Sequence, residues 1–169
     1  MLMQRYGDDL LRTAYLLLRD RHEAEEAVQD SFILAFERIG QLRDDAKLKS
    51  WLIRIVVNRC RMRQRTWSFR KLFPSPHVEK WLAKEKLPGP EAQLLRQWRN
   101  GRLTQAIHNL SYKYREVITL YYFQEMSVAE IAEHLDMSRN TVKARLARGR
   151  DYLKEQLEKE GESDWIRIH

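Results

Sequence analysis

Apolar residues recur at spacings of three and four along most of the chain, which is the period of an α-helix. All four prolines lie between positions 74 and 90, so helix-breaking residues are confined to one short stretch. On either side of it the helical pattern is uninterrupted. The sequence therefore predicts an all-α fold with two small helical domains, at 1–65 and 91–160, joined by a linker at 66–90 and followed by a tail at 161–169.

Three amphipathic helices are expected in the first domain, each marked by an apolar stripe. The stripes are Leu10, Leu11, Ala14, Leu17 and Leu18, then Ala24, Val28, Phe32, Ala35 and Ile39, then Leu48, Trp51, Leu52, Ile55 and Val56. Gly40 is expected to end the second helix, and residues 41–46 to form a short polar loop before the third.

Two helix starts are predicted in the first part of the second domain. Pro90 and Glu91 suit the beginning of a helix that continues toward Leu110. Ser111 is expected to cap a further helix over about 112–123.

A helix-turn-helix is predicted from about Met126 to Leu153. Ser127 and Glu130 have the spacing of a capping box, in which each side chain binds a backbone N–H of the other residue. Asp136 falls in the turn, where a left-handed backbone is needed and aspartate tolerates it. Ser138 is expected to cap the second helix, whose inner stripe is Val142, Leu146, Leu153 and Leu157.

The outward face of that second helix is typical of a recognition helix. Asn140, Ala144 and Ala147 point nearly opposite to Val142, so small or hydrogen-bonding side chains face outward. Basic residues flank them, as contacts to base edges and to phosphates require. The expected DNA-binding residues are Arg139, Asn140, Thr141, Lys143, Ala144, Arg145, Ala147 and Arg148. The alternative is an amphipathic hairpin with a basic face.

Charge is distributed unevenly along the chain. The net charge is +7 and the pI about 9.6, which favours an acidic partner such as nucleic acid or an anionic membrane surface. Residues 46–78 contain nine Lys or Arg and no acid, and residues 138–150 contain five and no acid. Two separate segments are therefore expected to hold a polyanion.

The first of these segments contains a second candidate site on the third helix. Arg54, Asn58, Arg61 and Arg65 form one stripe by their spacing, away from the apolar face that includes Trp51. The preceding loop adds Arg43, Lys47 and Lys49, and Trp51, which braces the loop, is counted with these residues as part of the site. A polar loop beside a basic stripe is suited to a single strand and a base pulled from its stack. A solvated charged face is the alternative.

Little in the sequence indicates catalysis. His22 and Glu26 are spaced to share a helix face, but there is no HExxH motif, no phosphate-binding glycine loop and no third metal ligand. Asp44 and Asp45 are explained by a turn. The lone Cys60 excludes an intrachain disulfide and is expected to be a small core residue. No enzyme activity, cofactor, metal or small-molecule substrate is expected. Without a signal peptide or membrane span, a cytoplasmic location is expected.

Three ordered segments resemble one family, the extracytoplasmic-function (group IV) sigma factors of bacterial RNA polymerase. Residues 22–39 resemble the core-binding segment of sigma region 2, residues 49–65 the −10 reader, and residues 114–153 the −35 reader of region 4. The family often has Leu-Pro where this chain has Leu110-Ser111, and Arg-Ala where it has Arg148-Gly149. Gly149 is mildly unfavourable in a helix.

The resemblance gives each surface a role. It implies that the polar face of the second helix, which by itself is expected to face solvent or a protein, docks on the clamp helices of the largest polymerase subunit through Glu25, Glu26, Gln29, Asp30 and Ile33. It also implies contact with the polymerase flap, duplex DNA at −35, single-stranded DNA at −10, a linker threading through polymerase, and an anti-sigma factor.

Two other functions remain open on the sequence. A helix-turn-helix regulator that binds duplex DNA as a dimer would use the second domain but gives no reason for the Asn58 stripe. A nucleic-acid-processing enzyme would need a cluster of acids or metal ligands.

Overall fold

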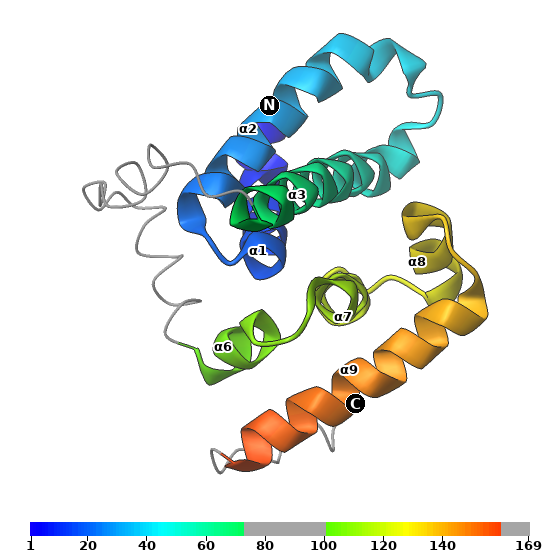
Figure 1. Ribbon diagram of the computed structural model, residues 1–169. Helices are drawn as coiled ribbons and strands as arrows, with labels where there is room; N and C mark the ends of the chain where they lie inside the picture. The colour runs from blue at the N-terminus through cyan, green and yellow to red at the C-terminus, as the bar shows by residue number, and fades with distance from the viewer. Residues whose placement is uncertain (73–100, 160–169) are drawn as a thin grey trace.

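The computed structural model describes residues 1–72 and 101–159, and within these two ranges it contains helices and no strand. Figure 1 shows one helical module built from the N-terminal range and a second from the C-terminal range, lying side by side. The all-α, two-domain prediction is confirmed. The predicted helix start at Pro90 and Glu91 and the tail at 161–169 lie outside the described residues.

The first module consists of α1 (Leu2–Leu18), α2 (Arg21–Arg38) and α3 (Leu48–Leu72). Arg19 ends α1 in the left-handed conformation with φ 64°, and its N–H binds the Tyr15 carbonyl. Asp20 then caps α2 by accepting a hydrogen bond from the Glu23 N–H. This tight corner makes α1 and α2 antiparallel, and α3 packs against both.

The predicted stripes form the core of this module, with one exception. Leu17, Phe32 and Leu52 are buried, and Cys60 is fully buried among them. Burial raises the pKa of the Cys60 thiol to about 12, which fits its expected role as a core residue. The exception is Ile39, which is 43% exposed because α2 ends at Arg38 and Ile39 begins a different turn. Its expected place on the apolar face of the second helix is therefore wrong.

The segment between α2 and α3 is more ordered than the predicted polar loop. It contains two short 3-10 turns, η1 (Ile39–Gln41) and η2 (Asp45–Lys47), and the Asp44 side chain caps η2. The helix that follows, α3, continues past position 65 to Leu72.

The second module consists of α6 (Arg102–His108), α7 (Tyr112–Ile118), a π-helical turn η3 (Thr119–Phe123), α8 (Val128–Leu135) and α9 (Arg139–Lys159). The capping box of Ser127 and Glu130 is present. Asp136 is left-handed with φ 53°, and the Ser138 hydroxyl accepts from the Thr141 N–H. These features confirm the helix-turn-helix geometry. Ser111 is the N-cap residue of α7, as expected, but its side chain makes no capping hydrogen bond.

The two modules pack against each other. In Figure 1, α7 passes beneath α1 and α3, and α8 lies near the N-terminal end of α3. Contacts join α1 to α6, α7 and η3. Several buried side chains at this boundary are polar, including Thr13, Arg115 and Gln124. The boundary is therefore held by directed hydrogen bonds as well as by apolar packing.

Gly149 lies where α9 crosses α7. A Cβ atom at this position would come within 2.9 Å of Ile118 Cγ1 and 3.1 Å of Ile118 Cδ1. Real Cβ atoms essentially never approach another heavy atom at 2.9 Å, so the glycine permits the close approach of the two helices. Its low helix propensity is thus offset by packing.

We expect Gly149→Ala to lower the free energy of unfolding by about 1 kcal/mol. The gain in helix propensity, about 1 kcal/mol, is outweighed by overpacking against Ile118, which typically costs about 1–3 kcal/mol. Gly7→Ala is the matched control, because Gly7 lies in α1 and a Cβ atom added there would have nothing within 4 Å. It should stabilise the chain by up to about 1 kcal/mol. Urea unfolding of both variants measures this, and equal stabilisation by both would contradict the close-packing role.

Candidate nucleic-acid interface

The recognition face of α9 is open to solvent. Val142 and Leu146 of α9 lie on the other side of the helix and are buried in the second module. The opposite side chains, Arg139, Asn140, Lys143, Ala144, Ala147 and Arg148, are exposed, and Thr141 and Arg145 are half-buried. The phase of the helix therefore agrees with the sequence prediction, and all eight residues expected to contact DNA lie on one helix.

Two of these basic side chains are held by groups of α7. Arg145 Nη1 lies 3.9 Å from Glu116 Oε1. The Arg148 guanidinium, which lies beside the Tyr114 hydroxyl, lowers the pKa of that phenol. Both guanidinium groups are therefore oriented by the layer beneath α9. Arg145, which is half-buried at the seam, is placed differently from the exposed Arg148.

The stripe on α3 is more varied in exposure. Arg54, Asn58 and Arg65 are exposed, whereas the Arg61 side chain is only 25% exposed. In the loop, Arg43, Lys47 and Lys49 are exposed, and Lys49 Nζ lies 3.6 Å from Asp9 Oδ2 of α1. Trp51 is partly buried against the core and Leu52 is fully buried, so the start of α3 is firmly seated.

Arg61 is engaged by the second module. Its Nε and Nη2 atoms donate to Glu116 Oε2 and Oε1, each at 2.9 Å, and its Nη1 lies 3.4 Å from the Leu135 carbonyl. The Glu116 side chain is 3% exposed. Glu116 is absent from the predicted site residues. Its position within the apolar run of α7 could have identified it, because an acid that is buried there requires a partner.

A second contact joins α3 to α8. The Ser50 hydroxyl lies 2.9 Å from His134 Nε2. Burial lowers the pKa of His134, and the positive charge of Arg54 lowers it further. Neither Ser50 nor His134 is identified by the sequence pattern.

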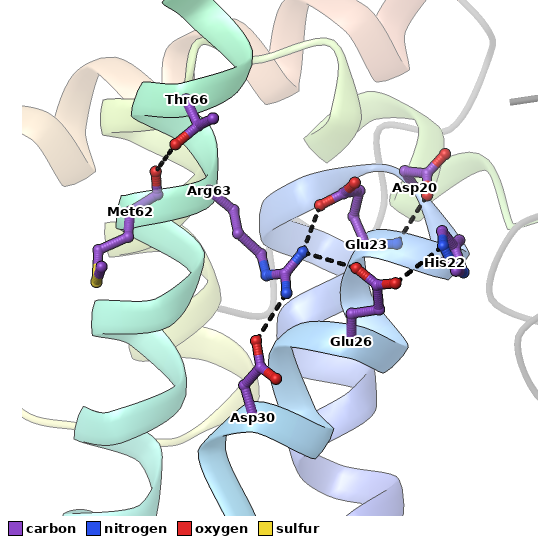
Figure 2. A network of polar contacts seen from close by, with 8 residues as sticks. All are labelled: Asp20, His22, Glu23, Glu26, Asp30, Met62, Arg63 and Thr66. Atoms are coloured by element: carbon purple, nitrogen blue, oxygen red, sulfur yellow. Dashed lines mark hydrogen bonds and ion pairs between the residues drawn. The ribbon is translucent and has the colours of Figure 1, made fainter. Parts of the chain in front are cut away.

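The acidic face of α2 is paired with α3 (Figure 2). Arg63 Nη1 donates to Glu23 Oε2 at 2.8 Å and to Glu26 Oε2 at 3.1 Å, and its Nη2 donates to Asp30 Oδ2 at 2.8 Å. Burial by itself would lower the pKa of Arg63, but the three carboxylates outweigh it and raise that pKa. Three carboxylates around one guanidinium tie α2 to α3. Glu25 is paired separately with Arg21 at 2.9 Å.

Beside this network α2 exposes apolar side chains. Ile33 is 55% exposed and Phe36 is 61% exposed. Gln29 is also exposed, so the outer face of α2 combines polar and apolar groups. Phe36 is not among the predicted site residues. Phe36 follows Ile33 by three residues, and this spacing indicates that both lie on one helix face outside the buried stripe.

The candidate catalytic features have ordinary surroundings. His22 Nε2 lies 3.1 Å from Glu26 Oε1 as a surface pair within α2. Across residues 1–72 and 101–159, no three His, Cys, Asp or Glu side chains are grouped to hold a metal ion. In the same part of the chain, no helix is long and apolar enough to cross a membrane.

The C-terminal carbonyls of α1 meet the second module. His108 Nε2 lies 3.0 Å from the Tyr15 carbonyl, and Arg19 Nη1 donates to the His108 carbonyl at 3.2 Å. The buried Arg115 donates to the Leu17 carbonyl at 3.1 Å and to the Leu110 carbonyl at 2.6 Å. Farther along α1, Gln124 donates to Thr13 and Asp9. A specific set of polar contacts therefore aligns the modules.

Both modules match known families. Residues 2–68 match the model of sigma-70 region 2, and residues 100–153 match that of sigma-70 region 4. The ECF RNA polymerase sigma factor SigW of Bacillus subtilis is 32% identical over 163 residues, with 90% of this chain and 84% of SigW covered. The ECF sigma factor SigM of Mycobacterium tuberculosis is 33% identical over 153 residues, covering 90% of this chain and 73% of SigM.

A solved structure extends the likeness to three dimensions. The sigma factor RpoE of Bartonella quintana, crystallised in complex with the anti-sigma factor NepR, is similar with a TM-score of 0.68 and 26% identity, covering 92% of this chain and 95% of RpoE. Two helical modules that match sigma-70 regions 2 and 4 define a transcription initiation factor of the sigma-70 class. Within that class, the chain belongs to the ECF sigma factors, which bind core RNA polymerase and direct it to particular promoters.

The His108 contact gives the joint between the modules a pH dependence. Burial lowers the pKa of His108 from 6.5 to about 4, and the nearby Arg115 and Arg19 also lower it, against the hydrogen bond to Tyr15. Between pH 6.5 and 4 the unfolded chain binds a proton that the folded chain does not. Stability from this group is therefore present above pH 6.5 and is lost as the pH falls.

We expect the native chain to lose about 2 kcal/mol more free energy of unfolding between pH 7 and pH 5 than the variant His108→Gln. His134 and the carboxylates are present in both proteins, so their titration cancels in the comparison. Urea unfolding at several pH values measures the difference, and the two stability curves should run parallel above about pH 7. Parallel curves down to about pH 5 would show that His108 titrates alike in both states.

Proposed function

We propose that this sigma factor reads its promoter with two surfaces, one on each module: the outer face of α9 binds the −35 duplex, and α3 with its preceding loop binds the −10 strand. The observation that supports this most directly is that each module exposes one basic helical face. On α9 the basic residues surround small side chains, and on α3 they line a stripe beside a polar loop. These are the different requirements of a duplex groove and of a single strand.

At −35 we assign different roles to different residues. Lys143 and Arg148 flank the small outward side chains, so they are placed to reach base edges together with Asn140. Arg139, Thr141 and Arg145 lie at the margins, where the strands' phosphates would pass. Ala144 and Ala147 leave room for the helix to enter the groove. The exposure of all but Thr141 and Arg145 supports this division.

At −10 we propose that one base of the non-template strand is taken from the stack into a pocket formed by residues 41–49 and Asn58. Pulling a base from the stack costs a few kcal/mol, which a protein without ATP chemistry supplies from binding energy. Arg54, Arg61 and Arg65 would hold the adjacent phosphates, and Arg43, Lys47 and Lys49 those at the loop. Two ordered turns and the seated Trp51 support a preformed loop.

We propose that α2 docks on the clamp helices of core polymerase, with a further contact between the second module and the flap. Gln29, Ile33 and Phe36 form the exposed part of this surface, and Glu25, Glu26 and Asp30 lie beside them. An anti-sigma partner is also proposed, because the similar RpoE is bound to one. The site of action would be the cytoplasm, where core polymerase is found.

Core binding through the apolar part of α2 can be tested with a matched pair of variants. Ile33→Ser should weaken binding to purified core polymerase at least tenfold, because an exposed apolar side chain at an interface centre loses its burial. Met3→Ser is the control, since Met3 is 54% exposed on α1 and Ile33 is 55% exposed on α2. Fluorescence anisotropy with labelled sigma factor gives both affinities. Equal affinities for core would contradict docking through α2. Charge reversal at Asp30 is less informative, because Asp30 also binds Arg63.

The different roles of the two modules, −10 strand binding and −35 duplex binding, can be tested by one substitution in each. Asn58→Ala should reduce open-complex formation more than closed-complex binding, and a pre-melted template should restore much of its activity. Asn140→Ala, the same change on α9, should weaken duplex −35 binding, and pre-melting should not restore it. Permanganate footprinting and gel shifts with core polymerase on a promoter selected from a genomic library measure both effects. If pre-melting rescues neither variant, the stripe on α3 binds only duplex DNA.

A further inference from the structure

An exposed apolar side chain lies in the middle of the basic face of α3. Met62 is 56% exposed, and it is the one large apolar side chain that is exposed within residues 48–68 of this helix. It follows Asn58 by four residues and precedes Arg65 by three, so the three side chains share one face. Figure 2 shows that Met62 points away from α2, on the opposite side of α3 from Arg63 and its carboxylates. Met62 therefore lies outside the surface of α2 to which core binding is assigned.

The side chains that share this face with Met62 carry positive charge. Arg54 and Arg65 are exposed there, and residues 46–78 contain nine Lys or Arg and no acid. An unpaired nucleic-acid strand fits such a surface, because its phosphates meet the cations and its bases have apolar faces. In a duplex those faces are stacked on one another, and a protein reaches the base edges in the grooves. An exposed thioether among guanidinium groups therefore favours an opened strand over closed DNA.

Met62 is placed beside the base that Asn58 is assigned to hold. A helix rises about 1.5 Å per residue, so Met62 lies about 6 Å along α3 from Asn58, and bases on one strand are about 3.4 Å apart. Met62 is thus within two base steps of the flipped base. Pulling that base from the stack uncovers a face of each neighbouring base. Methionine is among the apolar side chains that proteins insert beside unstacked bases, and its unbranched chain adapts to irregular surfaces.

We propose that Met62 packs against the uncovered face of a base next to the flipped −10 base and so opposes restacking of the opened strand. This inference rests on the assignment of α3 to the −10 strand. The contact is apolar, so it does not select one base by hydrogen bonds. It selects the open strand over the duplex, because the face that it covers is available only after the neighbouring base has left the stack. The open state is stabilised by this difference in affinity.

Two substitutions at Met62 separate an apolar contact from the mere presence of a long side chain. Met62→Gln keeps the length of the side chain and makes its end polar, whereas Met62→Leu keeps it apolar. Glutamine and leucine are good helix formers, as methionine is, and exposed substitutions of this kind change stability little, so both variants should fold. Met3→Gln is the matched control, because Met3 is 54% exposed on α1.

The probe is a promoter fork in which the −35 element is duplex and the non-template −10 strand is unpaired, bound by each sigma variant in complex with core polymerase. We expect Met62→Gln to weaken binding to this fork at least fivefold, and Met62→Leu and Met3→Gln to change it less than twofold. Binding to the fully paired promoter at low temperature should change less than twofold in all three variants. Unchanged fork binding by Met62→Gln, or equal weakening by Met62→Leu, would overturn the proposal.

Forks that carry one abasic nucleotide locate the contact. Where the base that Met62 covers is missing, Met62→Gln should cause no further loss of affinity, and at the other positions its full effect should remain. A full effect at every position, or an equal loss of affinity for core polymerase without DNA, would contradict a base contact, and the second result would place Met62 in a protein interface.

The footprinting comparison of Asn58→Ala tests the proposed function separately. If Asn58→Ala behaves as expected and Met62→Gln binds the fork like the parent, this inference alone is wrong. If Asn58→Ala opens the promoter like the parent while Met62→Gln weakens fork binding, the pocket assigned to Asn58 is wrong and the apolar contact is supported.

Discussion

The C-terminal carbonyls of α1 are the point on which the arrangement of the whole molecule depends. A helix leaves its last carbonyls without partners inside the helix, and buried carbonyls need donors. In this chain the donors are the backbone N–H of Arg19, the His108 ring and the Arg115 guanidinium, two of which belong to the second module. The end of one helix in the first module is therefore completed by the second module.

Arg115, the buried cation at this joint, is unusual in having backbone carbonyls rather than a carboxylate as its hydrogen-bond acceptors. Burial lowers the pKa of Arg115 to about 10, so the side chain is still charged near neutral pH. The negative end of the α1 dipole faces it, which favours a positive charge there. Arg61 and Arg63 are likewise paired with groups that lie on other helices. α3 contains a long basic segment and no acid of its own. The carboxylates that form ion pairs with it come from α1, α2 and α7.

Local signals predicted local structure well. Ser127, Glu130 and Asp136 act within a few residues of one another, so their spacing was sufficient to place the helix-turn-helix and its turn. The phase of Val142 and Leu146 likewise determined which side chains of α9 face outward. These are properties of one helix and its caps, which the sequence states directly.

Long-range pairings could not be obtained in the same way. Arg61 and Glu116 are 55 residues apart, and nothing in either segment selects the other. The basic stripe through Arg61 and Arg65 does not distinguish Arg63, although Arg63 is the residue that faces the acids of α2. The π-helical turn at Thr119–Phe123 and the exposure of Ile39 depend on how the chain leaves one helix for the next, and the apolar period does not report this. The sequence thus predicts surfaces better than it predicts which surfaces meet.

The burial of Cys60 has a consequence for signalling. Oxidants react with thiolates, and a thiol with a pKa of about 12 and no exposed surface is almost entirely protonated and out of their reach. The 169-residue sequence contains no other cysteine. Thiol oxidation is thus not a route by which these residues can register an oxidising environment while folded. If this sigma factor answers to a redox signal through cysteine chemistry, the reactive sulfur lies outside these 169 residues.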